Sequence, residues 1–185
     1  MRHGAESEGG AESAEGSEGA EAGDAVDAIT AQWAVERPEL DTLAMAVYGR
    51  VYRIARVMGD RMEAEYQRFG IGRGEFDVLG TLRRAGAPYT LSPRELSATL
   101  MLTTGGMTGR LDKLERAGLL VRSPDPHDRR GLRVTLTDRG VEVVDSALVA
   151  GLAVQHDALA ALAPEEGAQL AALLRRLLAA SAAGA

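Results

Sequence analysis

Arginine and lysine side chains gather in one stretch of a chain that is acidic as a whole. The 185 residues carry a formal net charge of −6, yet residues 103–139 hold eight basic against five acidic side chains. Guanidinium groups bind phosphate and carboxylate oxygens through paired hydrogen bonds, so this stretch favours an anionic partner. Two of these side chains, Arg129 and Arg130, stand in SPDPHDRRG, whose prolines and glycine predict a short projecting loop.

Other kinds of chemistry have little support. The three histidines, His3, His127 and His156, are too scattered for a metal site, and the chain has no cysteine for a disulfide or a thiolate ligand. The glycines of FGIGRGEFD match no phosphate-binding fingerprint, and no strand is predicted before them. We therefore expect neither an enzyme nor a metal or other cofactor.

The basic stretch begins with a pattern typical of two short helices. LSPREL puts proline at the first helical position, between Ser92 as N-cap and Glu95 as its capping-box partner. This helix should end near Leu100, and Thr103 should cap a second helix that runs to about Ala117. Two helices joined by about three residues predict a helix-turn-helix.

The apolar pattern then changes from helical to alternating. Residues 119–123 and 132–137 predict two strands, which the charged loop connects as a β-hairpin. A hairpin directly after a helix-turn-helix makes a winged helix, which places its second helix in the major groove of DNA and its hairpin tip on a minor groove. Double-stranded DNA is therefore the expected partner.

Helical winding predicts which side of the second helix faces DNA. Met107, Leu111 and Leu114 share one side and should belong to the core. The candidate DNA contacts are at the start and on the other side of this helix and in the wing loop: Thr103, Thr104, Gly105, Thr108, Lys113, Arg116, Asp128, Arg129 and Arg130. Glycines 105, 106 and 109 each cost about 1 kcal/mol relative to alanine. Close approach to DNA and tight packing against the preceding helix both remain open as reasons.

Four regions are expected in a mainly α protein with one small β-hairpin. Residues 1–23 predict a disordered acidic tail rich in Gly, Ala, Glu and Ser, which would be solubilising or would mimic DNA. Residues 24–69 predict a short helix that ends at Glu36 and a long helix from about Glu39 to Phe69. Residues 70–140 hold the winged helix-turn-helix, and residues 141–182 predict two more helices. The absence of a signal-peptide core or a membrane-spanning stretch favours a cytoplasmic location without membrane partners.

Two segments, LDKLERAGLLVR and the wing pattern DxRxxxVxLTxxG, resemble the multiple-antibiotic-resistance regulator (MarR) family of bacterial transcription factors. The resemblance covers roughly residues 40–180. It implies a homodimer, joined through residues 24–69 and 141–182, that binds a pseudo-palindromic operator. It also implies an ion pair in which Asp128 aims Arg130 into the minor groove.

A further set of residues resembles the urate-responsive branch of that family, and WAVERPELD is similar to its PecS-type subgroup. The matching side chains are Trp33, Asp77, Arg110 and Arg122. The resemblance implies a ligand-responsive repressor that a small anion such as urate releases from DNA. Two arginines would hold the anion, the tryptophan would stack on its ring, and displacement of an Asp77–Arg122 pair would shift the recognition helix.

Several alternatives remain open at this stage. Trp33 would otherwise be a packing residue, and Asp77 with Arg122 a structural ion pair. The effector would otherwise be a phenolic acid or another carboxylate, or DNA binding would be independent of any ligand. An architectural DNA-binding protein would tolerate many sequences, and a protein-interaction module would show no salt-dependent DNA binding.

Overall fold

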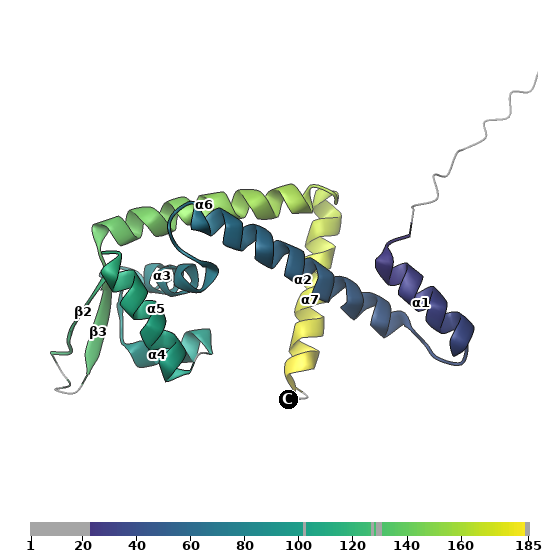
Figure 1. Cartoon of the computed structure of the whole chain (residues 1–185), viewed down its shortest axis with the longest axis horizontal. Helices are drawn as coiled ribbons and strands as arrows, with labels where there is room; N and C mark the ends of the chain where they lie inside the picture. Colours follow the sequence, from purple (N-terminus) through teal and green to yellow (C-terminus); the bar gives the residue numbers. More distant parts are fainter. Residues whose placement is uncertain (1–22, 102, 127, 129–130, 184–185) are drawn as a thin grey trace, which may run out of the picture. The chain divides into compact units, whose positions relative to one another are not determined.

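A computed structural model describes residues 23–101, 103–126, 128 and 131–183. Within these residues the chain forms seven helices and three short strands (Figure 1), which confirms the expected mainly α winged helix. The helices are α1 (Ala25–Glu36), α2 (Leu43–Gln67), α3 (Arg73–Arg84), α4 (Pro93–Leu100), α5 (Thr104–Arg116), α6 (Asp138–Leu159) and α7 (Pro164–Ala183). The strands are β1 (Thr90–Leu91), β2 (Leu120–Pro124) and β3 (Leu132–Leu136).

The chain divides into two units, residues 1–53 and 54–185. In the first, the Asp24 carboxylate caps α1 by accepting hydrogen bonds from the backbone N–H groups of Val26 and Asp27, at 2.7 and 3.0 Å. Arg50 of α2 donates to both carboxylates, at 2.9 Å to Asp24 and 2.6 Å to Asp27. Val26 is buried against Gly49, where an added Cβ would lie 3.1 Å from its Cγ1. A cap, a charged bridge and a close contact therefore hold α1 against the start of α2.

The long second helix starts later than its apolar pattern predicts, at Leu43 instead of Glu39. Residues 37–40 form a turn, in which the backbone N–H of Leu40 donates to the carbonyl of Arg37 at 3.1 Å. The Asp41 carboxylate then accepts from the backbone N–H of Leu43 at 2.9 Å. Local side-chain capping thus decides the boundary that periodicity alone placed four residues too early.

The sheet has three strands instead of the expected two. Its order is β1-β3-β2, with both pairs antiparallel, and Thr90 lies opposite Thr135 while Leu91 lies opposite Val134. The hydroxyl oxygens of Thr90 and Thr135 are 2.8 Å apart. Two residues are too few to show an alternating pattern, and this pairing joins distant segments, so the sequence did not reveal β1.

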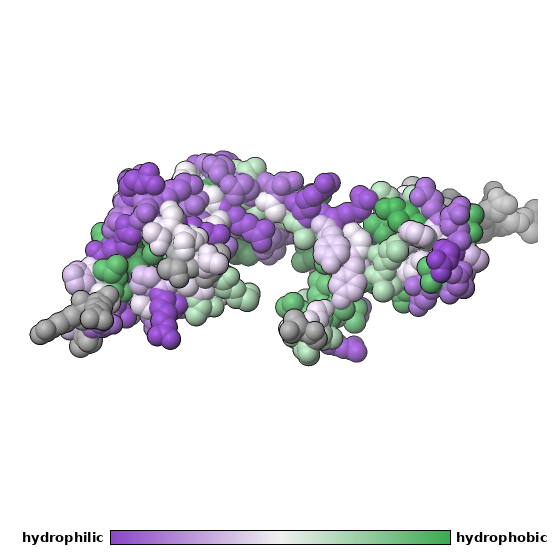
Figure 2. All heavy atoms as spheres, turned by 60° about the horizontal axis from the view of Figure 1, so that its bottom comes forward, coloured by the Kyte–Doolittle hydropathy of each residue, from purple (hydrophilic) through white to green (hydrophobic). Residues whose placement is uncertain are grey.

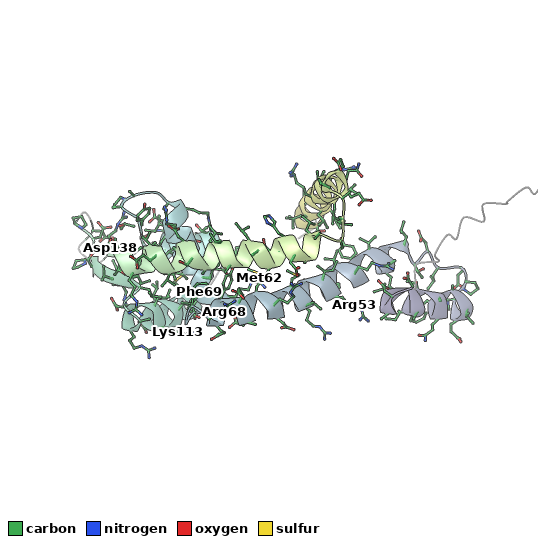
Figure 3. The ribbon with its side chains drawn as sticks, turned by 90° about the horizontal axis from the view of Figure 1, so that it is seen from above. Arg53, Met62, Arg68, Phe69, Lys113 and Asp138 are labelled. Carbon is green, nitrogen blue, oxygen red and sulfur yellow. The ribbon has the colours of Figure 1, made fainter. Side chains whose placement is uncertain are left out.

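The core of the second unit lies between α3, α4, α5, the sheet and the first half of α6. Fully buried side chains include Val78, Leu79, Leu82, Leu96, Met107, Leu114, Leu120, Val134 and Val144. Further along α6, Gly151 lets the helix pass close to Met62 and Tyr66 of α2, because an added Cβ would lie 2.8 Å from atoms of both. Figure 3, in which Met62 is labelled, shows this end of α2 beside α6. The second half of α2 therefore lies against α6.

In the described part of the chain, α6 and α7 fulfil the length and composition criteria for a membrane span only as a pair, bent by 104°; neither they nor any other single helix does so alone.

Candidate nucleic-acid interface and effector cavity

The helix-turn-helix is built by the predicted caps. Glu95 Oε2 accepts from the backbone N–H and the hydroxyl of Ser92, at 2.7 and 2.8 Å, and starts α4. Met101 ends α4 in the left-handed conformation, with φ of 51°, and its side chain is 92% exposed. The Thr103 hydroxyl then accepts from the backbone N–H of Gly106 at 3.3 Å, which starts α5. Both caps confirm the sequence analysis.

One face of α5 is core and the other is open, as the winding predicted. Met107, Leu111 and Leu114 are buried, whereas Gly105, Thr108 and Gly109 are exposed. A Cβ added at Gly105 or Gly109 would meet no atom within 4 Å, and one at Gly106 would meet only the hydroxyl of its own cap residue, at 3.4 Å. Tight packing against α4 therefore does not explain the glycines at 105 and 109. The side chain of Thr104 lies outside the described residues.

The two basic side chains predicted on this helix differ in their surroundings. Lys113 Nζ contacts Glu75 Oε2 of α3 at 2.8 Å, and the same carboxylate accepts from the backbone N–H of Gly72 at 2.8 Å. Arg116 is exposed, and its Nε donates to the Asp112 carbonyl at 3.1 Å. Lys113 thus connects α5 to the first turn of α3, a contact that the sequence analysis had not predicted.

The wing loop closes through its own backbone. The N–H of Asp125 donates to the Gly131 carbonyl at 3.0 Å, and the N–H of Gly131 donates to the Asp128 carbonyl at 2.8 Å. A Cβ at Gly131 would lie 2.9 Å from that of Asp125, so glycine is needed for this closure. Arg129 and Arg130 lie outside the described residues, and so does the expected pair of Asp128 with Arg130.

Arg122 contacts α5 rather than Asp77. Its NH1 lies 2.7 Å from Asp112 Oδ1 and its NH2 lies 2.5 Å from Glu115 Oε2, and among the described residues no ion pair joins it to Asp77. The expected Asp77–Arg122 pair is therefore wrong. The physical reason is that β2 follows α5 after a short turn, which places the last two turns of α5 beside it. Hydrogen bonding from Arg122 lowers the pKa of Glu115.

Arg110 lies on the flank of α5 and reaches the first turn of α3. Its NH1 donates to the Gly74 carbonyl at 3.2 Å, and a Cβ at Gly74 would lie 2.7 Å from its Cζ. Glycine at this position leaves the space that the guanidinium fills. Arg110 and Lys113 therefore contact the same turn of α3, at residues 72–75.

Asp77 lines a cavity of about 440 Å³ in the second unit. The wall is formed by Ala55, Met58, Gly59, Met62, Tyr66, Arg73, Phe76, Asp77 and Gln155. Tyr66 stacks on Phe76 with ring centroids 4.2 Å apart. Burial, and secondly the charge of Asp77, raise the pKa of Tyr66. The cavity thus joins an acid, a guanidinium, an amide and two aromatic rings.

The structure does not gather the four ligand residues that the resemblance implied. Asp77 is in the cavity, Arg110 contacts α3, and Arg122 contacts α5. Trp33 belongs to the first unit, where its side chain is 42% exposed. The sequence analysis missed Arg73, Tyr66 and Gln155. Arg73 stands in FGIGRGEFD, of which the sequence analysis considered only the glycines.

Comparison with known proteins identifies the family. Residues 69–131 match the model of the MarR family. The HTH-type transcriptional regulator PecS of Dickeya dadantii is 37% identical over 149 residues, which cover 80% of this chain and 90% of that protein. The chain belongs to the MarR family. This MarR-family protein is a DNA-binding transcription regulator and not an enzyme.

Solved structures of MarR-family proteins have the same fold. A mutant of E. coli MarR complexed with operator DNA is 25% identical, with a TM-score of 0.65, and the match covers 74% of this chain and 96% of that one. Sco5413 of Streptomyces coelicolor, a MarR-family regulator, is 26% identical, with a TM-score of 0.66, over 77% of this chain and 97% of that one.

Proposed function

We propose that this MarR-family regulator is a repressor that binds a pseudo-palindromic operator as a homodimer and leaves it when a small anion such as urate binds. The observation that supports α5 as the DNA-binding surface is its open face, where Gly105 and Gly109 have empty space beside them. No contact within the described part of the chain offsets the cost of these helical glycines. Close approach of a phosphate backbone or a base edge does offset it.

The start of α5 suits such an approach. Its first N–H groups point along the helix axis, the helix dipole favours a negative charge there, and Thr103 supplies a hydroxyl at the same end. The wing follows after a short turn, and its loop adds Arg129 and Arg130 by sequence. We therefore assign α5 to the major groove and the wing loop to the adjacent minor groove.

A second copy of the chain would cover exposed apolar side chains on α7. Leu173 is 58% exposed and Leu178 is 71% exposed, and Figure 2 shows green, apolar surface along this helix. In the first unit, Val35, Leu43 and Tyr52 are also exposed, at 79%, 68% and 70%. Large apolar surfaces of this kind mark protein interfaces. A twofold dimer would present two recognition helices, which is the reason to expect two inverted half-sites.

The cavity beside α3 is the proposed effector site. Arg73 supplies a cation for the anion, Gln155 supplies a hydrogen-bonding amide, and Asp77 is the acid that the resemblance implied. The aromatic pair of Tyr66 and Phe76 forms an apolar wall for a planar ring. The roles that the resemblance implied for Trp33, Arg110 and Arg122 at this ligand stay predictions.

The first turn of α3 provides a route from this cavity to DNA. Arg73 lies in this turn and faces the cavity, whereas Gly74 and Glu75 hold Arg110 and Lys113 of α5. An anion that moves Arg73 would move the turn on which α5 rests. Because ligand and DNA would then favour different arrangements, each would weaken the binding of the other. This route replaces the Asp77–Arg122 pair.

DNA binding is tested with a duplex enriched from a random-sequence pool by the unaltered protein. We expect two protected half-sites about one helical turn apart and an affinity that falls steeply with salt. Competing calf-thymus DNA should displace the protein only at large excess. Absence of salt-dependent binding, or uniform protection without half-sites, would contradict the proposal.

The effector is tested separately with millimolar urate, and with salicylate as a phenolic carboxylate. We expect urate to raise the melting temperature and to release the duplex, and Arg73→Gln and Asp77→Asn to remove both effects. Arg61→Gln is the matched control. Arg61 of α2 forms an ion pair with Asp157 of α6, and both helices line the cavity, but Arg61 itself does not. A response to salicylate alone would indicate that the effector is a phenolic acid and not urate. No response to either compound would indicate that DNA binding is independent of a ligand.

A further inference from the structure

We propose that Arg122 is a positioning residue for DNA binding: it clasps the wing to the recognition helix and so sets where the wing tip meets the minor groove. The inference rests on the proposed placement of α5 and the wing on DNA. It gives Arg122 a role that is separate from the effector cavity, which Arg122 does not line.

Both the backbone and the side chain of Arg122 are hydrogen-bonded to Glu115 of α5. Its backbone N–H donates to Glu115 Oε1 at 3.0 Å, while its Nε and NH2 donate to Glu115 Oε2 at 2.9 and 2.5 Å. Its NH1 also contacts Asp112 at 2.7 Å. A contact of the guanidinium alone would allow the strand to slide along the helix. The added backbone hydrogen bond fixes the strand itself.

Arg122 occupies the position along the wing at which such a tie matters. Arg122 lies opposite Val134, which is fully buried. Closer to the base of the hairpin, Leu120 lies opposite Leu136, and both belong to the core. Towards the tip, the next pairs are Ser123 with Arg133 and Pro124 with Leu132. The clasp is therefore at the boundary between the part of the hairpin that the core holds and the part that projects towards DNA.

A second, looser contact supports the projecting part from the other side. Arg133 NH1 lies 3.9 Å from Glu95 at the start of α4 and 3.8 Å from Asp125 in the wing loop. These distances are near the limit for an ion pair, whereas the contacts of Arg122 are at hydrogen-bond length. Of these two contacts between the wing and the helix-turn-helix, the one made by Arg122 is therefore the closer.

The clasp also neutralises two acids on the helix that faces DNA. Asp112 and Glu115 have side chains 45% and 35% exposed, on the same helix as the predicted phosphate contacts. Unpaired carboxylates there would repel phosphates. Charge and geometry are separable, because a lysine at 122 keeps the charge but cannot make the paired contacts of a guanidinium.

The test compares three variants on the enriched duplex. For Arg122→Gln we expect roughly ten-fold weaker binding, loss of hydroxyl-radical protection in the outer minor grooves, and retained guanine-N7 protection in the major grooves at saturating protein. Arg122→Lys should recover part of the affinity but not the minor-groove protection. Arg83→Gln is the control, because Arg83 makes its two-point contact, at 2.9 and 3.1 Å, with Asp145 of α6 and not with α5 or β2; we expect an unchanged footprint.

Three results would overturn the clasp. They are an unchanged footprint for Arg122→Gln, full recovery of minor-groove protection by lysine, and equal loss of protection in both grooves. If Arg122→Gln does not fold, Glu115→Gln removes the contact with Glu115 from the helix side, and its readout is the loss of minor-groove protection. Failure of the unaltered protein to bind any duplex would instead contradict the proposed function, so the two failures are distinguishable.

Discussion

Gly140 of α6 lies directly against the carbonyl group of Leu119 at the start of the wing. A Cβ at position 140 would overlap the Leu119 oxygen and lie 3.0 Å from its carbon. The Thr137 N–H donates to the same oxygen at 3.1 Å, and the Thr137 hydroxyl caps α6 by accepting from the Gly140 N–H at 3.0 Å. The place where α6 leaves the winged helix is therefore set by backbone contact.

Gly140→Ala should destabilise the protein strongly. The methyl group meets backbone atoms that cannot rotate away, so either α6 or the wing base must shift. We expect the free energy of unfolding to fall by roughly 3 kcal/mol in urea denaturation. Gly59→Ala is the control, because a Cβ there meets only Arg73 NH1, at an ordinary 3.5 Å. A loss that is no larger at 140 than at 59 would contradict the packing argument.

Gly105→Ala and Gly109→Ala should separate stability from DNA binding. Each added methyl group enters empty space on a helix, so each should raise the free energy of unfolding by about 0.5–1 kcal/mol. The same methyl groups would stand between α5 and DNA, so affinity for the enriched duplex should fall. Urea denaturation and fluorescence anisotropy measure the two effects on the same samples. If both variants bind the duplex with unchanged affinity, DNA does not contact this face of α5.

Arg130→Ala tests the wing tip, whose arginines are known from the sequence alone. We expect specific binding to weaken strongly, with an unchanged melting temperature and an unchanged dimer, because the side chain is expected to act only in the minor groove. Arg56→Ala removes an exposed arginine from α2 and should leave the affinity unaltered. Gel-shift titration at fixed salt is the measurement, and equal affinities of the two variants would rule out the wing contact.

Leu178→Glu should disrupt the proposed dimer. The residue is 71% exposed on α7, so a glutamate is tolerated in a monomer but would be buried against a second copy. Sedimentation equilibrium should report dimers for the unaltered protein and monomers for the variant. Leu132→Glu, at a 45% exposed position on the wing, should stay dimeric. Dimers for both variants would exclude this face of α7 as the interface.

Acid should destabilise the fold through four carboxyl groups. Hydrogen bonds from Arg50, the backbone of Arg73, the backbone of Ser92, and Arg122 lower the pKa values of Asp27, Glu63, Glu95 and Glu115, respectively. The pKa values of these four carboxyl groups are lower in the folded protein than in the unfolded chain. At a pH above the unfolded-state pKa values, the four groups therefore make their full contribution to the stability of the fold.

This stabilisation is lost as the pH falls from about 4 through the folded values. Melting temperatures should therefore be level near neutral pH and fall below pH 4. Glu115→Gln and Glu63→Gln should each flatten that fall. A melting temperature that stays constant down to pH 3 would contradict the prediction.

Local signals in the sequence were enough to find the DNA-binding half of the molecule. The Ser92–Glu95 capping box, the Thr103 cap and the buried stripe of Met107, Leu111 and Leu114 all follow from contacts within a few residues. Each rests on helix geometry, which spacing along the chain encodes directly. The same applies to the wing, whose strands alternate and whose loop carries proline and glycine.

The spacing of residues along the chain did not predict the contacts between distant segments. Nothing local indicates that Arg122 meets Glu115 and Asp112 instead of Asp77, that Arg73 shares a cavity with Gln155, or that Thr90 pairs with Thr135. A charged side chain pairs with whichever partner the packing brings within a few ångströms, and several acids were available to each arginine. The amino-acid sequence therefore determined the helices, the caps and the basic wing, whereas tertiary packing decided which of their side chains act together.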